Sequence, residues 1–457
     1  MKTILNTWSK ALFTAGLLIA IGTGCSKETG CKDPLAANYD PNAEKDCCCF
    51  YEIITESDNT VISGSITSNT TWTSDNIYEL AGKVVVENNA TLTIQPGTII
   101  KGRTGTGSLA SALIISRGAK LMAEGNSSQP IIFTSIIDNI AIGQLVGSNL
   151  SELDNGRWGG LIILGNARIS AEEGDDMAQI EGIPANEAYG AYGGDDDNDN
   201  SGIIRYVSVR HGGALIGEGN EINGITLGGV GSGTVIDHVE VVANEDDGIE
   251  FFGGSVNVTN VIIAFQKDDG IDIDQNYSGT VDNFFVIHGV STDEGLEIDG
   301  PEGSLSDGYF TLRNGTIRNT TPGTGSAADL KSKAQGTIEN VTFWGYDGGS
   351  WMKVRASFQE DCSTPKSDAY SYFIQTPAKL TIIGCEFGNP IGDDIFKVYT
   401  ASTDANTVTC PVPANYQTDA DFLFNPLNPL QNASTASVGA DLSQFDNWSW
   451  AYLKNKY

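Results

Sequence analysis

Pairs of carboxylates recur in the middle of the sequence, each directly before a glycine, and a further carboxylate follows two residues after that glycine. The candidate metal ligands in these blocks are Asp246, Asp247, Glu250, Asp268, Asp269, Asp272, Asp293 and Glu297. Neighbouring carboxylates repel one another, so they must take up protons, stay hydrated or bind a cation. Ca²⁺ suits them because it accepts about six to eight oxygen ligands in flexible geometry. Zinc, copper and iron do not, because the whole chain has only three histidines.

A structural role without a metal is the competing interpretation of the same blocks. Asp tolerates tight turns and Gly supplies positive φ, so Asp-Gly steps also serve as ordinary turns. The sequence leaves both interpretations open, and Ca²⁺ is the one cofactor that it predicts.

Self-alignment of the sequence indicates which elements position these residues. Gly224, Gly248, Gly270 and Gly295 recur at intervals of 24, 22 and 25 residues, with short β-branched runs between them. Such a period means that each repeat buries its apolar face only by stacking on the next repeat. The sequence therefore predicts an all-β fold, a single-stranded right-handed parallel β-helix. A β-propeller is disfavoured because its blades are longer.

Strand alternation within this alignment predicts three columns of stacked residues. The inward column is Ile249, Ile271, Leu296, Leu330, Met352 and Phe396. The first outward column is Glu250, Asp272, Glu297, Lys331, Lys353 and Lys397, and the second is Phe252, Asp274, Asp299, Lys333, Arg355 and Tyr399. One face is thus expected to be acidic for three turns and then basic, with Glu297 and Lys331 within pairing reach.

The Asp-Gly-Ile steps and the repeat resemble the pectate-lyase-like β-helix superfamily over roughly residues 80–400. The Asp-Asp-Gly-x-Asp/Glu pattern is similar to the one with which calcium-dependent polysaccharide lyases of that superfamily bind calcium. In those enzymes Ca²⁺ neutralises a uronate carboxylate, and a Lys or Arg removes the sugar C5 proton. The resemblance implies that the first six acidic residues named above bind Ca²⁺ and that Lys331 or Lys333 is the base. Catalysis is disfavoured because a general base needs a lowered pKa, and adjacent carboxylates raise that of a lysine.

Three smaller signals have a binding and a structural interpretation each. Asp195, Asp197 and Asp199 alternate as in a calcium-binding loop, but an EF-hand would have Gly at Asn200 and Glu at Tyr206. The three histidines, His211, His238 and His288, are predicted to be structural. The Trp residues near the C-terminus, such as Trp448 and Trp450, are expected to cap the open end of the solenoid core rather than bind sugar rings.

The N-terminus reads as a targeting segment. Two lysines precede the apolar run 11–21, and Gly22-Thr23-Gly24-Cys25 resembles the lipobox of bacterial lipoprotein signal peptides. The resemblance implies that residues 1–24 are removed and that Cys25 is lipidated. The protein would then be an outer-membrane lipoprotein of the cell envelope, exposed at the surface.

Export would place the other seven cysteines in an oxidising compartment, where disulfide pairing is the default. Cys31, Cys47, Cys48 and Cys49 belong to a segment that resembles a short cysteine module of exported Gram-negative surface proteins. Cys362 and Cys410 are candidates to close a surface loop, with Cys385 as the odd thiol, and the pairing stays open. The predicted organisation is the signal peptide, a small disulfide-bearing N-terminal module and tether at 25–55, the β-helix at 56–400 and a C-terminal loop and capping segment at 401–457.

Composition limits the function. With 26 Lys+Arg against 58 Asp+Glu, the net charge of −32 excludes a nucleic-acid-binding surface. The sequence favours a lipid-anchored, non-catalytic surface module that binds glycan or protein partners with structural Ca²⁺. The alternatives are a Ca²⁺-dependent uronate lyase and an accessory subunit of an outer-membrane complex.

Overall fold

A computed structural model describes most of the chain. The described residues are 29–32, 45–46, 59–172, 174, 176–216, 222–321, 324–346, 352–388, 396–400, 410–424, 429–430 and 436–457. The chain divides into two units between Glu56 and Ser57. No helix among the described residues is long and apolar enough to cross a membrane.

In the first unit, β1 (Thr29–Gly30) pairs in parallel with β2 (Lys45–Asp46). Cys31 follows β1, is fully buried and is disulfide-bonded. The predicted lipidation site, Cys25, and the candidate disulfide residues Cys47, Cys48 and Cys49 lie outside the described residues.

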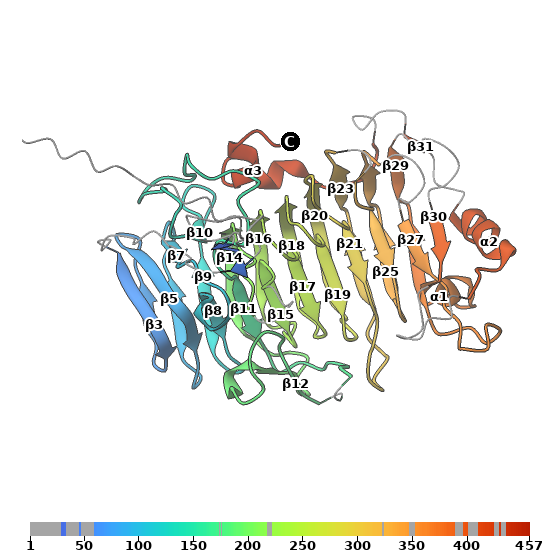
Figure 1. Cartoon of the computed structure of the whole chain (residues 1–457), viewed down its shortest axis with the longest axis horizontal. Helices are drawn as coiled ribbons and strands as arrows, with labels where there is room; N and C mark the ends of the chain where they lie inside the picture. The colour runs from blue at the N-terminus through green and yellow to red at the C-terminus, as the bar shows by residue number, and fades with distance from the viewer. Residues whose placement is uncertain are drawn as a thin grey trace, which may run out of the picture. The chain divides into compact units, whose positions relative to one another are not determined.

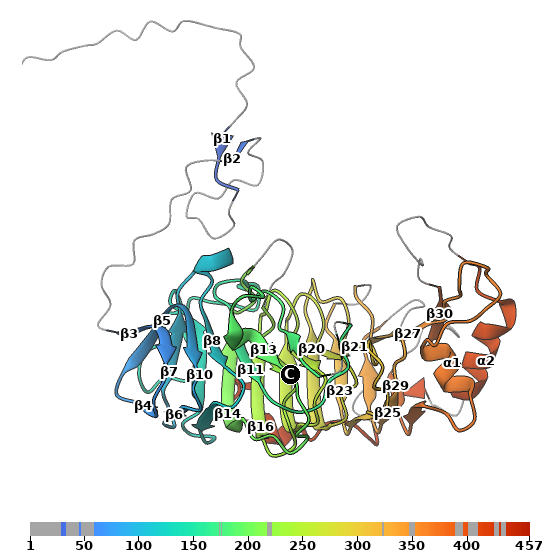
Figure 2. The same ribbon diagram turned by 90° about the horizontal axis from the view of Figure 1, so that it is seen from below.

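The second unit is a parallel solenoid, whose strands stack in order from β3 to β30 (Figure 1, Figure 2). Each rung contributes to three stacks. The first stack contains β4 (Thr70–Trp72), β6 (Thr91–Ile94), β9 (Lys120–Glu124), β22 (Phe310–Arg313), β25 (Gly336–Glu339) and β28 (Leu380–Ile383). The second contains β7 (Ile99–Gly102), β10 (Ile131–Ser135), β23 (Thr316–Asn319), β26 (Thr342–Trp344), β29 (Glu386–Gly388) and β31 (Pro429–Leu430).

The third stack positions the predicted metal ligands. It contains β8 (Ala112–Ile115), β11 (Leu161–Leu164), β15 (Ile225–Gly228), β17 (Ile249–Phe252), β19 (Ile271–Asp274), β21 (Leu296–Ile298), β24 (Ala328–Leu330), β27 (Met352–Arg355) and β30 (Phe396–Tyr399). Longer strands bend from one stack into another: β3 (Thr60–Ile66), β5 (Ile77–Val86), β14 (Gly202–Arg210), β16 (Val235–Val242), β18 (Asn257–Ala264) and β20 (Thr280–His288). The predicted parallel β-helix is confirmed.

Several short elements lie outside the stacks. They are the antiparallel pair β12 (Ala178–Gln179) and β13 (Ala191–Tyr192), the 3₁₀ turns η1 (Gly107–Leu109), η2 (Ala188–Gly190) and η4 (Leu442–Phe445), and the helices α1 (Ala369–Ile374), α2 (Ala414–Phe424) and α3 (Trp450–Leu453).

One residue per rung, in the left-handed region, forms the corner between the first and second stacks. The φ angle is 53° at His238, 55° at Asn260 and 59° at Asn283. Asn adopts this conformation more readily than most residues, and the Asn283 side-chain amide donates to Asn260 Oδ1 at 2.7 Å. This column explains why Asn or His recurs at this position of the repeat.

Inward side chains of the three stacks form one continuous core. Ile249, Ile271 and Leu296 are consecutive members of the predicted inward column, and each is at most 1% exposed. Truncating such a side chain to Ala costs about 2–5 kcal/mol. Because inward and outward residues alternate, this packing also fixes the outward carboxylates between them.

The strand register confirms the predicted columns upstream and corrects them downstream. Glu250 pairs with Asp272, and Asp272 with Glu297, as predicted. Glu297, however, pairs with Asp329 rather than Lys331, and Asp329 pairs with Lys353. The predicted alignment of Leu330 with Leu296 and Met352 is therefore wrong by two residues. A shift of two residues keeps every side chain on its own face, so alternation alone does not detect it.

The expected role of the C-terminal aromatic residues is also wrong. Trp448 contacts Tyr206 and His238, and Trp450 contacts His211 and Phe265, all beside the middle rungs. α3 packs on β16, whereas α1 and α2 pack on β27 and β30 (Figure 1). The segment 436–457 thus covers the side of the solenoid instead of its end.

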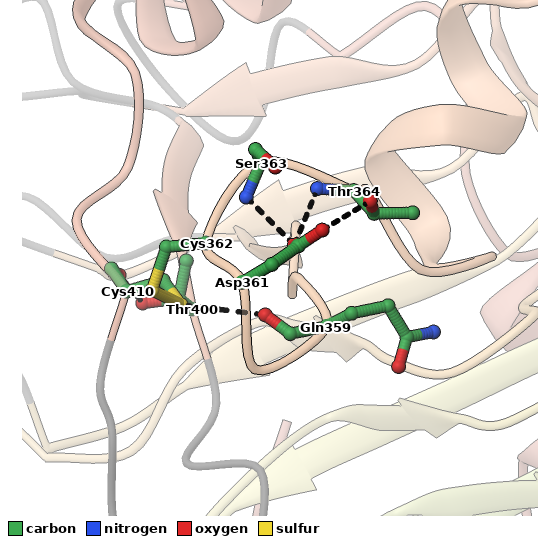
Figure 3. The surroundings of a disulfide bond; sticks show 7 residues. All are labelled: Gln359, Asp361, Cys362, Ser363, Thr364, Thr400 and Cys410. Carbon is green, nitrogen blue, oxygen red and sulfur yellow. Dashed lines mark hydrogen bonds between the residues drawn. A yellow bond between two sulfur atoms is a disulfide. The ribbon is translucent and has the colours of Figure 1, made fainter.

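A disulfide joins Cys362 and Cys410, the pair that the sequence indicated for a surface loop (Figure 3). Beside it, the Asp361 carboxylate accepts hydrogen bonds from the backbone N–H groups of Ser363 and Thr364, at 2.9 and 2.8 Å. Cys385 is free and buried. The bond therefore closes a loop at the downstream end of the β-helix.

Candidate metal centre

A carboxylate row runs along the outward face of the third stack, formed by Glu250, Asp272, Glu297 and Asp329. Buried Thr226 precedes it, and Lys353 and Lys397 follow it. Each of these carboxylates belongs to the second residue of its strand and points outward, between two apolar residues that point inward. The solenoid therefore forces these charges together at the strand spacing of about 4.8 Å.

The turns before the strands bring further carboxylates to the row. Oxygens of Asp246, Asp247 and Asp268 lie within 4.8 Å of one another, as do those of Asp247, Glu250 and Asp272. We call these five residues the upstream cluster. The downstream cluster lies one rung further on. It consists of Asp269, Glu294 and Glu297, whose carboxylate oxygens also lie within 4.8 Å of one another.

Backbone hydrogen bonds between rungs fix the turn carboxylates. The Asp269 N–H donates to Asp247 Oδ1 at 2.9 Å, and the Glu294 N–H donates to Asp269 Oδ1 at 2.8 Å. These bonds hold one oxygen of Asp247 and one of Asp269 against the next turn. The predicted ligand set is thus largely assembled, although Asp293 is exposed and belongs to neither cluster.

Two buried oxygen acceptors at the upstream cluster have no hydrogen-bond partner among the described residues. They are Asp272 Oδ1 and Asn223 Oδ1. Asp272 is 8% exposed and Asn223 is 2% exposed. The Asn223 amide nitrogen donates to Glu250, which places its oxygen at the edge of the cluster. Unpaired buried acceptors cost about 1–3 kcal/mol each, so their presence favours an occupant that bonds to oxygen.

The electrostatics of the upstream cluster disfavour a full set of bare carboxylates. Burial raises the pKa of Asp247, Glu250 and Asp272 well above the usual range, and the neighbouring carboxylates raise it further. Burial, with the charges of Asp299 and Glu302, raises the pKa of adjacent Asp274 to about 8. These groups must therefore share protons or be neutralised by a cation.

The two clusters differ in the lysine and arginine side chains that form ion pairs near them. In the downstream cluster, Lys331 pairs with Glu297 and Lys353 pairs with Glu294. Arg355 contacts Asp299 at 3.4 Å and Asp368 at 3.5 Å. No lysine or arginine among the described residues forms an ion pair with Asp247, Glu250 or Asp272. The all-oxygen donor set and the two unpaired acceptors fit Ca²⁺.

The candidate bases are engaged elsewhere. Lys331 forms the predicted pair with Glu297 despite the shifted register. Lys333 Nζ donates to the backbone carbonyl of Pro301 at 2.6 Å and to that of Glu302 at 3.4 Å. For Lys353, the bond to Glu294 and nearby carboxylates outweigh the effect of burial and raise the pKa.

The structure does not bring the three carboxylates of the acidic loop 195–199 together at one site. Asp197 pairs with Arg168 at 2.6 Å, and buried Asp199 accepts a hydrogen bond from Ser201 at 3.0 Å. Asp195 is exposed. Within the described chain, these residues are not among the converging carboxylate groups.

Each histidine has a structural partner. His211 Nδ1 lies 2.7 Å from the Asp154 carbonyl, His238 Nδ1 lies 2.8 Å from Asp237, and His288 Nε2 lies 3.0 Å from the Tyr346 hydroxyl. Sequence reasoning missed Asn223 as a potential ligand. Its signal was its place directly before Gly224, where the next three rungs carry a carboxylate.

Comparisons with known proteins identify a family for the fold. The family model described as pectate-lyase like beta helix domain matches residues 64–381. A search of solved structures found the crystal structure of PfbA, a surface adhesin of Streptococcus pneumoniae. Sequence identity is 11% and the TM-score is 0.36, with 76% of this chain and 74% of that chain covered. A search of curated proteins found no match.

Proposed function

This chain belongs to the pectate-lyase-like β-helix family, and we propose that it is a non-catalytic binding module of the cell envelope whose upstream cluster holds Ca²⁺. Binding of a glycan or an envelope protein is its proposed role. The calcium ion would stabilise the stack of acidic rungs that presents the binding surface.

One observation supports the calcium proposal most directly. Lys331 and Lys353 pair with Glu297 and Glu294, two of the three carboxylates of the downstream cluster, whereas Asp247, Glu250 and Asp272 have no basic partner among the described residues. The same β-helix therefore compensates one half of its acidic surface internally and leaves the other half to protons or to a bound cation. Hard oxygen ligands in a flexible arrangement are what Ca²⁺ prefers.

The lysines support a non-catalytic role. A lyase of the resembled kind needs a basic group that gives up its proton near the working pH. Lys331 is held in an ion pair, and Lys333 is bound by two backbone carbonyls. Neither is a free base beside the upstream cluster.

Attachment to the outer membrane through lipid at Cys25, with the β-helix at the cell surface, is part of the proposal and is supported by the lipobox resemblance. A role as an accessory subunit of an outer-membrane complex would differ in one respect. It predicts co-purification with a membrane partner in place of glycan binding.

A lyase assay tests the non-catalytic role. The purified protein is incubated with polygalacturonate and alginate in the presence of Ca²⁺, and the absorbance of unsaturated sugar products is followed. We expect no product from the wild type. Activity that disappears in Lys331→Ala but persists in Lys397→Ala, a lysine further along the same face, would show that the protein is an enzyme.

Calcium binding is tested separately by isothermal titration calorimetry. We expect heat of binding with CaCl₂ that is lost in Glu250→Gln and retained in Asp195→Asn, a matched change of an exposed carboxylate. Equal binding by both variants would place any calcium elsewhere.

A further inference from the structure

The upstream end of the β-helix is a rung with free strand edges. Among the described residues, β3 pairs only with β5, and β4 pairs only with β6. We call β3 and β4 together the first rung. Because β3 bends from the second stack into the third, the first rung presents one free edge in each of the three stacks (Figure 1).

Backbone groups of the first rung point away from the solenoid. The carbonyls of Ile66 and Trp72 accept hydrogen bonds from the second rung, at 3.1 and 3.0 Å. In a parallel strand, the N–H and C=O groups of neighbouring residues point to opposite sides. Ser65 and Thr71 therefore direct their N–H and C=O groups towards the free edge, and both residues are exposed. Such an edge is a template on which another strand can pair.

The other end of the β-helix is protected against this kind of pairing. β30 is the last strand of the third stack, and α2 packs against it. The Gln417 side chain on α2 accepts a hydrogen bond from the Val398 N–H at 2.9 Å and donates one to the Phe396 carbonyl at 2.8 Å. One amide thus occupies both kinds of backbone group on that edge. Among the described residues, the first rung has no equivalent side chain.

The sequence of the first rung also lacks the usual protection of an edge. Residues 59–74 contain no charged side chain and no proline, although edge strands of monomeric proteins often carry them. The chain as a whole has a net charge of −32, so two copies repel each other over most of their surface. This repulsion is weakest where neither copy presents a carboxylate. The first rung is such a surface, which favours a second copy of the same chain as its partner.

The apolar core is incompletely covered at the same place. Ile62 and Ile66 are inward residues of β3 and stack on Leu80 and Val86 of the next rung. Leu80 and Val86 are fully buried, because a rung covers them on either side, whereas Ile62 and Ile66 are only partly buried. A further rung supplied by another chain would complete this burial in the way that rungs cover one another within the solenoid.

We propose that the first rungs of two copies pair about a twofold axis and form an end-to-end dimer. A twofold axis across the solenoid axis makes the facing strands antiparallel, and each copy offers the same donors and acceptors to the other. The interface is distinct from the upstream cluster and goes beyond the proposed binding role. It would give one assembly two binding surfaces, which raises the avidity for a repetitive ligand.

Sedimentation equilibrium and hydrogen–deuterium exchange of the mature chain, expressed without its lipid, test the interface. We expect a monomer–dimer equilibrium, and amide protection in residues 60–72 that increases with the fraction of dimer. Ser65→Pro removes an edge N–H, and Val61→Lys brings like charges together across the axis. Each should raise the dissociation constant of the dimer at least about ten-fold. Val290→Lys, at a valine that is 57% exposed against 50% for Val61, should dimerise as the wild type.

Three results would overturn the proposal. The first is a chain that stays monomeric at every concentration with freely exchanging amides in residues 60–72. The second is a monomer in which these amides are protected at every concentration, since another part of the same chain would then cover the rung. The third is a dimer that persists in both variants, which would place the interface elsewhere. Val61 is exposed, so Val61→Lys decides the matter if Ser65→Pro does not fold.

Discussion

Replacing Asp272 by Asn is expected to change thermal stability in opposite directions without and with calcium. Asp272 lies in the carboxylate row between Glu250 and Glu297, and its oxygens lie within 4.8 Å of those of Glu250 and Asp247. Two unit charges at that distance repel by about 3.5 kcal/mol when the effective dielectric constant is about 20. Asp272 has two such neighbours, so the upper bound is about 7 kcal/mol. In EDTA the variant should therefore be more stable than the wild type, but by much less than this bound, since proton uptake already relieves part of the repulsion.

Calcium should reverse the order of the two proteins. At about 10 mM Ca²⁺ and a dissociation constant of about 0.1 mM, typical of extracellular sites, binding stabilises the native state by about 2.7 kcal/mol. Unfolding entropy of about 2.1 cal/mol/K per residue over roughly 400 residues converts this to a rise in Tm of about 3 °C. Asp272→Asn removes a charged ligand and should lose most of that rise.

Differential scanning calorimetry measures both effects on the same samples. The wild type, Asp272→Asn and the exposed control Asp195→Asn are melted in EDTA, in CaCl₂ and in MgCl₂. Mg²⁺ should have a smaller effect, because it demands a near-octahedral site and retains its waters. The reasoning is refuted if EDTA leaves the Tm of the wild type unchanged, or if all three proteins gain equally from calcium.

Three further predictions concern stability. Burial lowers the pKa of His288 to about 3, whereas an unfolded histidine titrates near 6.5. The unfolded state therefore binds more protons below pH 6.5, and the wild type should lose about 2 kcal/mol between pH 7 and pH 5 on that account. In His288→Gln this part of the pH dependence should be absent from denaturant titrations, and an unchanged slope would show that His288 does not cause it. Replacing both Cys362 and Cys410 by Ser opens a loop with a sequence separation of 48. It should lower the free energy of unfolding by about 4 kcal/mol in the chain-entropy model, as measured by denaturant titration, and an unchanged free energy of unfolding would contradict this. Glu240 accepts the backbone N–H groups of Trp450 and Ala451 at 2.9 and 3.0 Å. Glu240→Ala should release the C-terminal segment, detected as faster tryptic cleavage there. It should also destabilise the β-helix, because buried Arg210 loses the carboxylate that lies 3.8 Å away. Resistance to trypsin equal to the wild type would contradict the importance of these contacts.

The period of the sequence was enough to predict the fold, because a β-helix repeats the same local choices in every rung. Glycines at 248, 270 and 295 and the corner residues His238, Asn260 and Asn283 mark equivalent positions in consecutive turns. Stacking then brings residues about 22 positions apart into contact. The convergence of Asp247, Glu250 and Asp272 follows from these local signals.

Features without a repeat were not predictable in the same way. The connection between β21 and β24 is longer than those that join β17 to β19 and β19 to β21, so apolar alternation fitted Leu330 as well as Ala328. The position of Trp450 depends on a contact with Glu240, which is 210 residues away and has no periodic signature.

The corrected register also strengthens the case for a cation. Had Lys331 followed Glu297 in the outward column, the carboxylate row would have ended after three rungs. Asp329 occupies that place, so the row has a fourth carboxylate, and the tyrosine hydroxyl of Tyr399 donates to it at 2.7 Å. Lys353 pairs with Glu294, Lys331 with Glu297 and Arg355 with Asp299. The basic residues of the downstream rungs are thereby committed to downstream carboxylates, and the charge of the upstream cluster is left to protons or, as we propose, to Ca²⁺.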